Sequence, residues 1–164
     1  MLRLIQPTKK YKATYIEALH ESMKDSLYPE GLTYQIENFE SHIQETRNAK
    51  RGVTSGVPRS EYWLMDGDTY IGTIQIRHTP SGRYPNIKSH IYYEIRPSKR
   101  SLGYGTHILR LGLKKAKTIG LSELIIACDE DNIGSKKIIE ANGGVLLSKE
   151  KIPDGSILKY KIKL

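Results

Sequence analysis

The sequence predicts a domain of the mixed α/β class, in which helices cover both faces of a mixed sheet. One observation is that the middle of the chain has strand periodicity, whereas the segments before and after it return to helical spacing. The other is the length of 164 residues, which suits one continuous hydrophobic core. We therefore expect a single domain over residues 1–164 that needs no disulfide or metal to stabilise it.

The first third of the chain is expected to form one strand and two helices. Residues 2–6 are short and apolar, and Pro7 ends this strand. Thr8 can cap a first helix, whose apolar residues recur every three or four positions. Residues 28–31, Tyr-Pro-Glu-Gly, are expected to break this helix, and a second helix is predicted over residues 34–47.

The middle of the chain is expected to be β-structure. Residues 62–65 and 70–76 flank the turn Asp66-Gly67-Asp68, which is the pattern of a strand, a tight turn and a second strand. A loop rich in glycine and proline over residues 80–85 then leads to a third β-prone run, residues 87–95.

The last third alternates between helical and strand patterns. Residues 124–128 are a short apolar run, as is typical of a central strand covered on both faces. Gly120 follows the first apolar helical stretch and Gly143-Gly144 follow the second, as expected of left-handed helix ends. The expected elements are a helix from Gly103 to Gly120, the strand 124–128, a helix from Asn132 to Asn142, and closing strands 145–147 and 157–164.

The charge and the cysteine content limit the partners and the location. The net charge of +8, from 26 Lys and Arg against 18 Asp and Glu, suits a nucleic acid, a membrane surface, a phosphorylated cofactor or an ordinary solvated surface. A basic nucleic-acid-binding module is therefore one rival interpretation, although no helix-turn-helix, zinc-ligand or aromatic RNA-binding motif supports it. The single cysteine, Cys128, and the lack of a long apolar stretch predict a cytoplasmic protein without membrane association.

The segment from Ile95 to Thr106, IRPSKRSLGYGT, carries the most specific chemical signal. A strand ends, a basic turn follows, and two glycines open a long helix, whose free N–H groups and dipole favour an anion. Glycine also lets a phosphate approach the backbone closely. No Walker pattern is present, and Ile108 replaces the third small residue of a dinucleotide fingerprint. The segment is therefore predicted to be a pyrophosphate cradle of another kind.

The pattern Arg100-x-x-Gly103-x-Gly105 resembles the acyl-CoA loop of the GNAT superfamily of N-acetyltransferases. Pro97 precedes the loop as it commonly does in that family, and residues 131–135 and 142–144 resemble two further family motifs. The resemblance covers about residues 60 to 150. It implies a mixed, mostly antiparallel sheet of six to seven strands with helices on both faces.

The resemblance also implies the reaction and the partners. Acetyl-CoA would donate its acetyl group directly to a primary amine of a small molecule or peptide in a ternary complex, without a metal. A homodimer would suit the family, and no nucleic acid is expected. The residues that would hold the cofactor are Tyr93, Glu94, Ile95, Arg100, Ser101, Leu102, Gly103, Tyr104, Gly105, Thr106, Asn132 and Ser135.

The acid and base of such a reaction are less clearly indicated by the residues. His90 and Glu94 lie in the strand beside the expected cofactor and are the candidates for the general base. Many family members have a tyrosine as general acid where this chain has Ile139. Tyr93 or Tyr104 could replace it, the thiolate could leave without an acid, or the protein could be an inactive acyl-CoA sensor.

Substrate contacts are expected from Tyr28 and Glu30 near the first helices and from Asp129 at a strand end. These side chains could line a pocket or attract a cationic amine. Cys128, next to Asp129, could carry a transient acetyl group, but a small buried core residue is the favoured interpretation.

Overall fold

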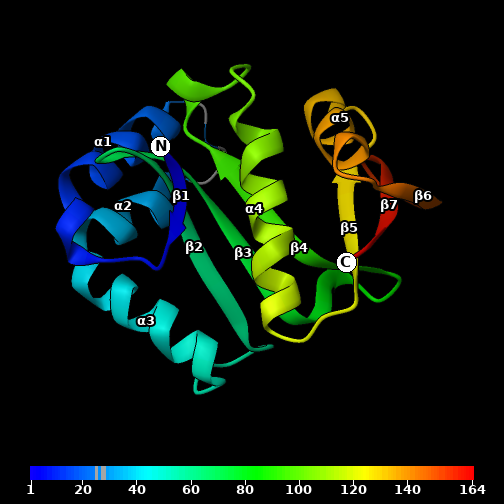
Figure 1. The fold of residues 1–164 in the computed structure, drawn as a ribbon, viewed down its shortest axis with the longest axis horizontal. Helices are drawn as coiled ribbons and strands as arrows, with labels where there is room; N and C mark the ends of the chain where they lie inside the picture. The colour runs from blue at the N-terminus through cyan, green and yellow to red at the C-terminus, as the bar shows by residue number, and fades with distance from the viewer. Residues whose placement is uncertain (25, 27–28) are drawn as a thin grey trace.

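The computed structural model describes residues 1–24, 26 and 29–164, and this part contains seven strands, five α-helices and two short 3₁₀ helices (Figure 1). Their order is β1 (Leu2–Ile5), η1 (Lys9–Tyr11), α1 (Lys12–Met23), α2 (Pro29–Glu37), α3 (Phe39–Arg51), β2 (Arg59–Asp66), β3 (Thr69–Tyr84), β4 (Ile87–Ile95), η2 (Pro97–Lys99), α4 (Tyr104–Thr118), β5 (Glu123–Asp129), α5 (Ile133–Ala141), β6 (Val145–Ile152) and β7 (Gly155–Lys163). The mixed α/β class is confirmed.

The seven strands form two antiparallel sheets, with the orders β1-β2-β3-β4 and β5-β7-β6. The expected single sheet is divided between β4 and β5, which lie side by side in Figure 1. At this junction side chains of β4 bind the backbone of β5: the Ile125 N–H donates to Nδ1 of His90 at 3.0 Å, and the Ala127 N–H donates to Oγ of Ser89 at 3.3 Å. These contacts satisfy β5 amides that a continuous ladder would have used.

Helices cover both faces, as predicted. On one face α1 and α3 pack against β2 and β3 over an aromatic cluster, in which the ring of Tyr15 is stacked on Trp63 with centroids 4.4 Å apart. On the other face α4 packs against β3 and β4, and its Ile108 and Leu109 are fully buried. Figure 1 shows α4 between the two groups of strands and α1 to α3 on the far side of the larger sheet.

Three boundary predictions were wrong. Residues 29–31 do not break a helix, since Pro29 begins α2, where a missing N–H costs nothing, and Tyr28 lies outside the described residues. The helix expected over 34–47 is therefore parts of two helices, which meet at Asn38. The loop expected over 80–85 is also wrong, because β3 continues to Tyr84 through register shifts that accommodate Pro80.

A buried charge fastens α1 to the end of β4. The guanidinium of Arg96, which is only 4% exposed, donates from Nε and Nη2 to the Glu21 carboxylate and from Nη1 to the Tyr70 carbonyl at 3.2 Å. Glu21 also accepts the backbone N–H of Ser98 at 3.2 Å. The hydrogen bonds from Arg96 lower the pKa of Glu21 to about 2. Helix α1 is thus tied to the turn from which the glycine loop starts.

Candidate active site

The two glycines of the loop meet different structural requirements. Gly103 has φ +81° and caps α4, and a Cβ added there would meet no atom within 4 Å. This position therefore needs glycine for its backbone conformation and not for space. At Gly105 a Cβ would overlap Cδ1 of Ile138, so glycine there allows α4 and α5 to pack closely. The sequence indicated phosphate access as the only reason for both glycines, so the packing role of Gly105 was not predicted.

A cavity of about 650 Å³, which we call the loop cavity, lies where the end of β4 and the starts of α4 and α5 meet. It is lined by Tyr93, Glu94, Ile95, Arg100, Ser101, Gly103, Gly105, Thr106, Asn132, Gly134, Ser135, Lys137 and Ile138. Of the expected cofactor residues, Leu102 and Tyr104 are outside this lining. The Leu102 side chain is 64% exposed, and the Tyr104 hydroxyl donates to Oδ2 of Asp66 at 3.4 Å.

The chemistry of the loop cavity fits an elongated ligand with phosphates at one end. Arg100 and Lys137 bring positive charge, and Nε of Arg100 donates to the Ile95 carbonyl at 3.0 Å, which holds the loop against β4. Oη of Tyr93 is buried and has no hydrogen-bond partner among the described residues. A buried hydroxyl without a partner is costly, so its position beside the cavity suits a polar ligand group. These residues fit coenzyme A.

A second cavity of about 310 Å³, the helix-side cavity, lies between β4 and the helices α1 and α2. Its lining is Ser22, Ser26, Gly31, Leu32, Gln35, Tyr92, Glu94 and Arg100. Glu94 and Arg100 therefore border both cavities, and Nη2 of Arg100 lies 3.8 Å from Oε1 of Glu94. The Tyr92 hydroxyl donates to Oε2 of Glu94 at 2.9 Å. Burial and the neighbouring Glu94 raise the pKa of Tyr92, so this hydroxyl stays protonated.

His90, the other base candidate, lies elsewhere. Its side chain is buried between β4 and β5, where Nδ1 accepts the Ile125 N–H, and it lines neither cavity. Burial lowers the pKa of His90, which favours the neutral ring that this hydrogen bond needs. In this position the histidine joins the two sheets.

A third cavity, of about 170 Å³, opens between the sheets and brings Tyr93, Cys128, Asn132 and Ile139 together. The side chain of Tyr93 thus borders the same space as Ile139, the position at which the family resemblance implies a tyrosine. Burial raises the pKa of the Cys128 thiol to about 11, with Asp129 adding to the effect. A thiol with this pKa is protonated near neutral pH and is a poor nucleophile.

The expected substrate residues do not come together. Glu30 is exposed in the first turn of α2 and is outside the lining of the helix-side cavity, although its neighbour Gly31 belongs to it. Asp129 borders the third cavity instead. Tyr28 lies outside the described residues. The helix-side cavity is lined instead by Gln35 and Tyr92, which sequence reasoning did not select, although Tyr92 stands two positions before Glu94 on one strand.

Asn132 begins α5, as expected from its position before the helix. Its Oδ1 accepts the backbone N–H of Ser135 at 3.0 Å, and both residues line the loop cavity. Since this cap occupies Oδ1, Nδ2 of Asn132 is the group left to donate to a ligand.

Comparisons with known proteins identify the family of the chain and structures with the same fold. Residues 1–145 match the family described as the acetyltransferase (GNAT) domain. Among solved structures, RimL, a ribosomal L7/L12 alpha-N-protein acetyltransferase in complex with coenzyme A, has a TM-score of 0.76 at 15% identity, over 99% of this chain and 94% of that one. No curated protein sequence matches.

Two further structures have the same fold. Mycobacterium smegmatis RimJ, in complex with CoA-disulfide, has a TM-score of 0.77 at 16% identity, with 99% of this chain and 81% of that one covered. The aminoglycoside acetyltransferase AAC(6')-Ib, in complex with coenzyme A and kanamycin, has a TM-score of 0.70 at 16% identity, with 99% and 95% covered.

The chain belongs to the GNAT family of acetyltransferases. The resemblance found in the loop sequence, and the acyltransferase activity expected from it, are confirmed at this level. Within the described residues no helix is long and apolar enough to cross a membrane.

Proposed function

We propose that this protein moves the acetyl group of acetyl-CoA directly to a primary amine of a small molecule or peptide. The observation that carries the proposal is the position of Glu94, whose side chain borders both the loop cavity and the helix-side cavity. A donor in the first cavity and an amine in the second would meet beside this carboxylate. The coenzyme A complexes of structures with the same fold support the assignment of the loop cavity to the donor.

Each part of the loop cavity has a role in holding acetyl-CoA. The backbone of residues 93–95 would pair with the pantetheine arm, and the amides of Gly103, Gly105 and Thr106, at the positive end of α4, would bind the pyrophosphate. Arg100 and Lys137 add charge to this end. Nδ2 of Asn132 donates to the arm near the thioester.

The reaction needs a base for the ammonium and an acid for the departing thiolate. Acetyl-CoA supplies the activated acetyl group. Glu94 accepts the proton of the amine, and Tyr92 holds the carboxylate in place through its hydrogen bond to Oε2. Tyr93, which stays protonated because burial raises its pKa, donates to the thiolate. Cys128 carries no acetyl group, since its thiol is protonated.

The cofactor site is tested by Gly103→Ala with Gly120→Ala as its matched control. Both glycines have positive φ, +81° and +92°, and neither has an atom within 4 Å of an added Cβ, so the two substitutions cost similar backbone strain. Gly103 starts α4 and Gly120 follows its end. Calorimetric titration with acetyl-CoA should show affinity weakened about tenfold or more for Gly103→Ala, because misaligned amides lose charge-assisted hydrogen bonds. Equal weakening in both variants would remove the support for a backbone cradle.

The general acid is tested by Tyr93→Phe with Tyr104→Phe as control. We expect kcat to fall about tenfold for Tyr93→Phe, less than the usual loss of acid catalysis, because a thiolate is a fair leaving group. The Tyr104 hydroxyl binds Asp66 outside the loop cavity, so its removal should leave kcat nearly unchanged. Single-turnover acetylation kinetics measure both. An unchanged rate in Tyr93→Phe would mean that the thiolate leaves without an acid.

Three expectations from the sequence stay predictions. These are the cytoplasmic location, the homodimer and the absence of nucleic-acid or metal partners. The sensor interpretation differs from the proposal in one measurable way, since a sensor would bind acetyl-CoA and acetylate no amine. Turnover with a panel of primary amines separates the two.

A further inference from the structure

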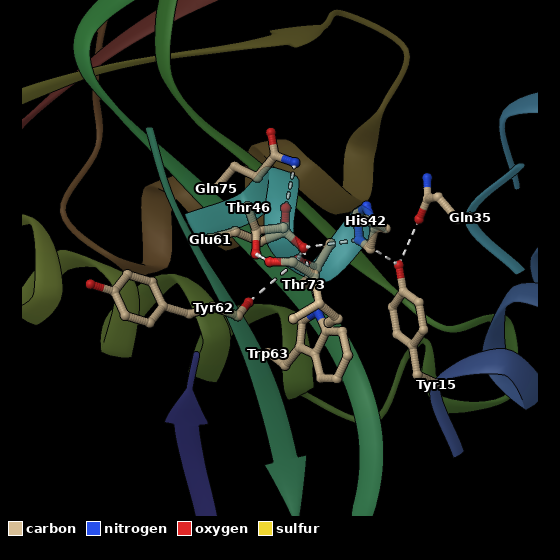
Figure 2. Close-up of polar contacts among 10 residues, drawn as sticks. Tyr15, Gln35, His42, Thr46, Glu61, Tyr62, Trp63, Thr73 and Gln75 are labelled. Atoms are coloured by element: carbon tan, nitrogen blue, oxygen red, sulfur yellow. Dashed lines mark hydrogen bonds and ion pairs between the residues drawn. The ribbon is translucent and has the colours of Figure 1, made fainter. Parts of the chain in front are cut away.

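A chain of polar side chains runs from the helix-side cavity into the interior, on the α1 to α3 face of the larger sheet (Figure 2). It begins at Gln35, which lines the cavity. Oε1 of Gln35 accepts the hydroxyl of Tyr15 at 2.6 Å, and the Tyr15 oxygen lies 3.2 Å from Nε2 of His42. The same Nε2 lies 3.9 Å from Oε1 of Glu61.

Glu61 is the fixed end of this chain. Its side chain is 8% exposed, and it accepts hydrogen bonds from Nε2 of Gln75 at 3.1 Å and Nε1 of Trp63 at 3.4 Å. The hydroxyl of Thr73 lies 3.5 Å from the carboxylate and 3.3 Å from the Tyr62 carbonyl, and it donates to these two acceptors in turn or shares its proton between them. Figure 2 shows these donors gathered around the carboxylate on β2 and β3. A carboxylate has no proton to give, so it can only accept in these contacts.

The ionised carboxylate sets the direction of every hydrogen bond in the chain. The Glu61 carboxylate beside Nε2 suits the tautomer of His42 whose N–H is at Nε2, so Nε2 donates to the Tyr15 oxygen. The Tyr15 hydroxyl must then donate onward to Oε1 of Gln35. Burial, with Glu61 as the next contribution, raises the pKa of Tyr15, which keeps that hydroxyl protonated. With Oε1 occupied in this way, the Gln35 amide turns its Nε2 donors away from Tyr15.

We propose that Gln35 selects acceptors by donating a hydrogen bond from Nε2 to an oxygen that lies beside the reacting amine. The inference rests on the proposed function, because it assigns the helix-side cavity to the acceptor. Glu94 borders that cavity and takes the ammonium proton, while Gln35 lines the same cavity from α2. The preferred acceptor is therefore a primary amine that also carries a hydroxyl or carbonyl oxygen. Tyr15, His42 and Glu61 are positioning residues, which act through Gln35.

The test compares three amines of similar size: ethanolamine, glycinamide and propylamine. Ethanolamine presents a hydroxyl, glycinamide a carbonyl, and propylamine no oxygen. Their affinities for the protein saturated with coenzyme A are measured by calorimetry, and kcat/KM is measured with acetyl-CoA. The variant Gln35→Met keeps the length of the side chain and removes the donor, and Gln44→Met makes the same change at an exposed position of α3.

For each protein, the preference is the affinity or kcat/KM for an oxygen-bearing amine divided by that for propylamine. For at least one of the two oxygen-bearing amines, this preference should be about tenfold larger in the wild type and Gln44→Met than in Gln35→Met, which is the contribution of one good hydrogen bond. Comparing this ratio between the wild type and a variant cancels the differences in basicity between the amines, because each amine has the same basicity with every protein. Comparison of ethanolamine with glycinamide shows which oxygen Gln35 recognises. Glu61→Gln, which can donate as well as accept, should reduce the same ratio to a smaller extent while acetyl-CoA affinity is unchanged.

A preference that survives in Gln35→Met would overturn the inference, as would an equal loss for all three amines or no binding of any of them to the wild type. If Gln35→Met loses the preference but Glu61→Gln keeps it, the directional role of the buried chain is wrong. Binding with the expected preference but without acetyl product would refute the proposed reaction and leave the recognition by Gln35 supported.

Discussion

Replacing Glu94 with glutamine is expected to lower kcat for amine acetylation by about 10²- to 10⁴-fold, the usual loss when a general base is removed. The amide has nearly the shape of the carboxylate, so Tyr92 keeps a partner at this position. The glutamine amide cannot accept the proton of an ammonium. Steady-state kinetics with saturating acetyl-CoA measure the change, and an acceptor found to be active with the wild type is used throughout.

Two controls separate a base from a structural residue at this position. Acetyl-CoA affinity should change little in Glu94→Gln, because the expected cofactor contact there is made by the backbone. His90→Gln should reduce stability through the contact with Ile125 and leave the pH profile of kcat in its place. Two results together would identify His90 as the general base. These are a kcat of at least half the wild-type value in Glu94→Gln and a shifted pH profile of kcat in His90→Gln.

Replacing Glu21 with glutamine is expected to lower the free energy of unfolding by about 3 kcal/mol and Tm by about 6–12 °C. The reason is that Arg96 is almost fully buried and would lose its main counter-charge. Glu17, which is mostly exposed, lies 3.4 Å from Nη2 of Arg96 and offsets part of the lost charge pairing. We therefore expect a stability loss at the low end of the range for breaking a buried ion pair. Urea unfolding at pH 7 measures the difference.

The pH dependence of this effect has a definite sign. The pKa of Glu21 is about 2 in the folded protein, below its ordinary value of 4.5, so the unfolded chain binds this proton more readily. The stabilisation is complete above pH 4.5 and is lost as the pH falls toward about 2. The stability difference between wild type and Glu21→Gln should therefore shrink over that interval.

Glu130→Gln is the matched control for Glu21→Gln. Glu130 forms an ion pair with Lys149 at 2.7 Å, but both side chains are well exposed, and pairs of this kind contribute little. We expect Tm to stay close to that of the wild type. If Glu21→Gln and Glu130→Gln lower Tm equally, the burial of Arg96 does not control the strength of its ion pair with Glu21.

Most of the loop cavity could be predicted from the sequence because local backbone needs determine it. Gly103 must take a positive φ to open α4, and Asn132 must cap α5, and both requirements appear as residue types at a given spacing. The second reason for glycine at position 105 was not visible, since the side chain it avoids, Ile138, lies 33 residues further along the chain.

The choice between His90 and Glu94 depended on tertiary structure. On a regular strand both would be on one face, and the sequence offered no reason to separate them. The sheets divide between β4 and β5, and His90 is used there to bind the backbone of β5, whereas Glu94 and Tyr92 remain beside the cavities. Where a sheet divides depends on how all seven strands pack.

The sequence by itself determined the class of the fold, the family and the position of the glycine loop at the start of α4, because short runs of residues encode helix starts, turns and strand periods. Tertiary structure alone decided which carboxylate borders two cavities and which amide, Gln35, is oriented by a buried glutamate 26 residues away in the chain. Such sites form when side chains from α1, α2, α3 and β2 meet, and no local pattern in the sequence encodes a contact between segments that approach only after the core has packed.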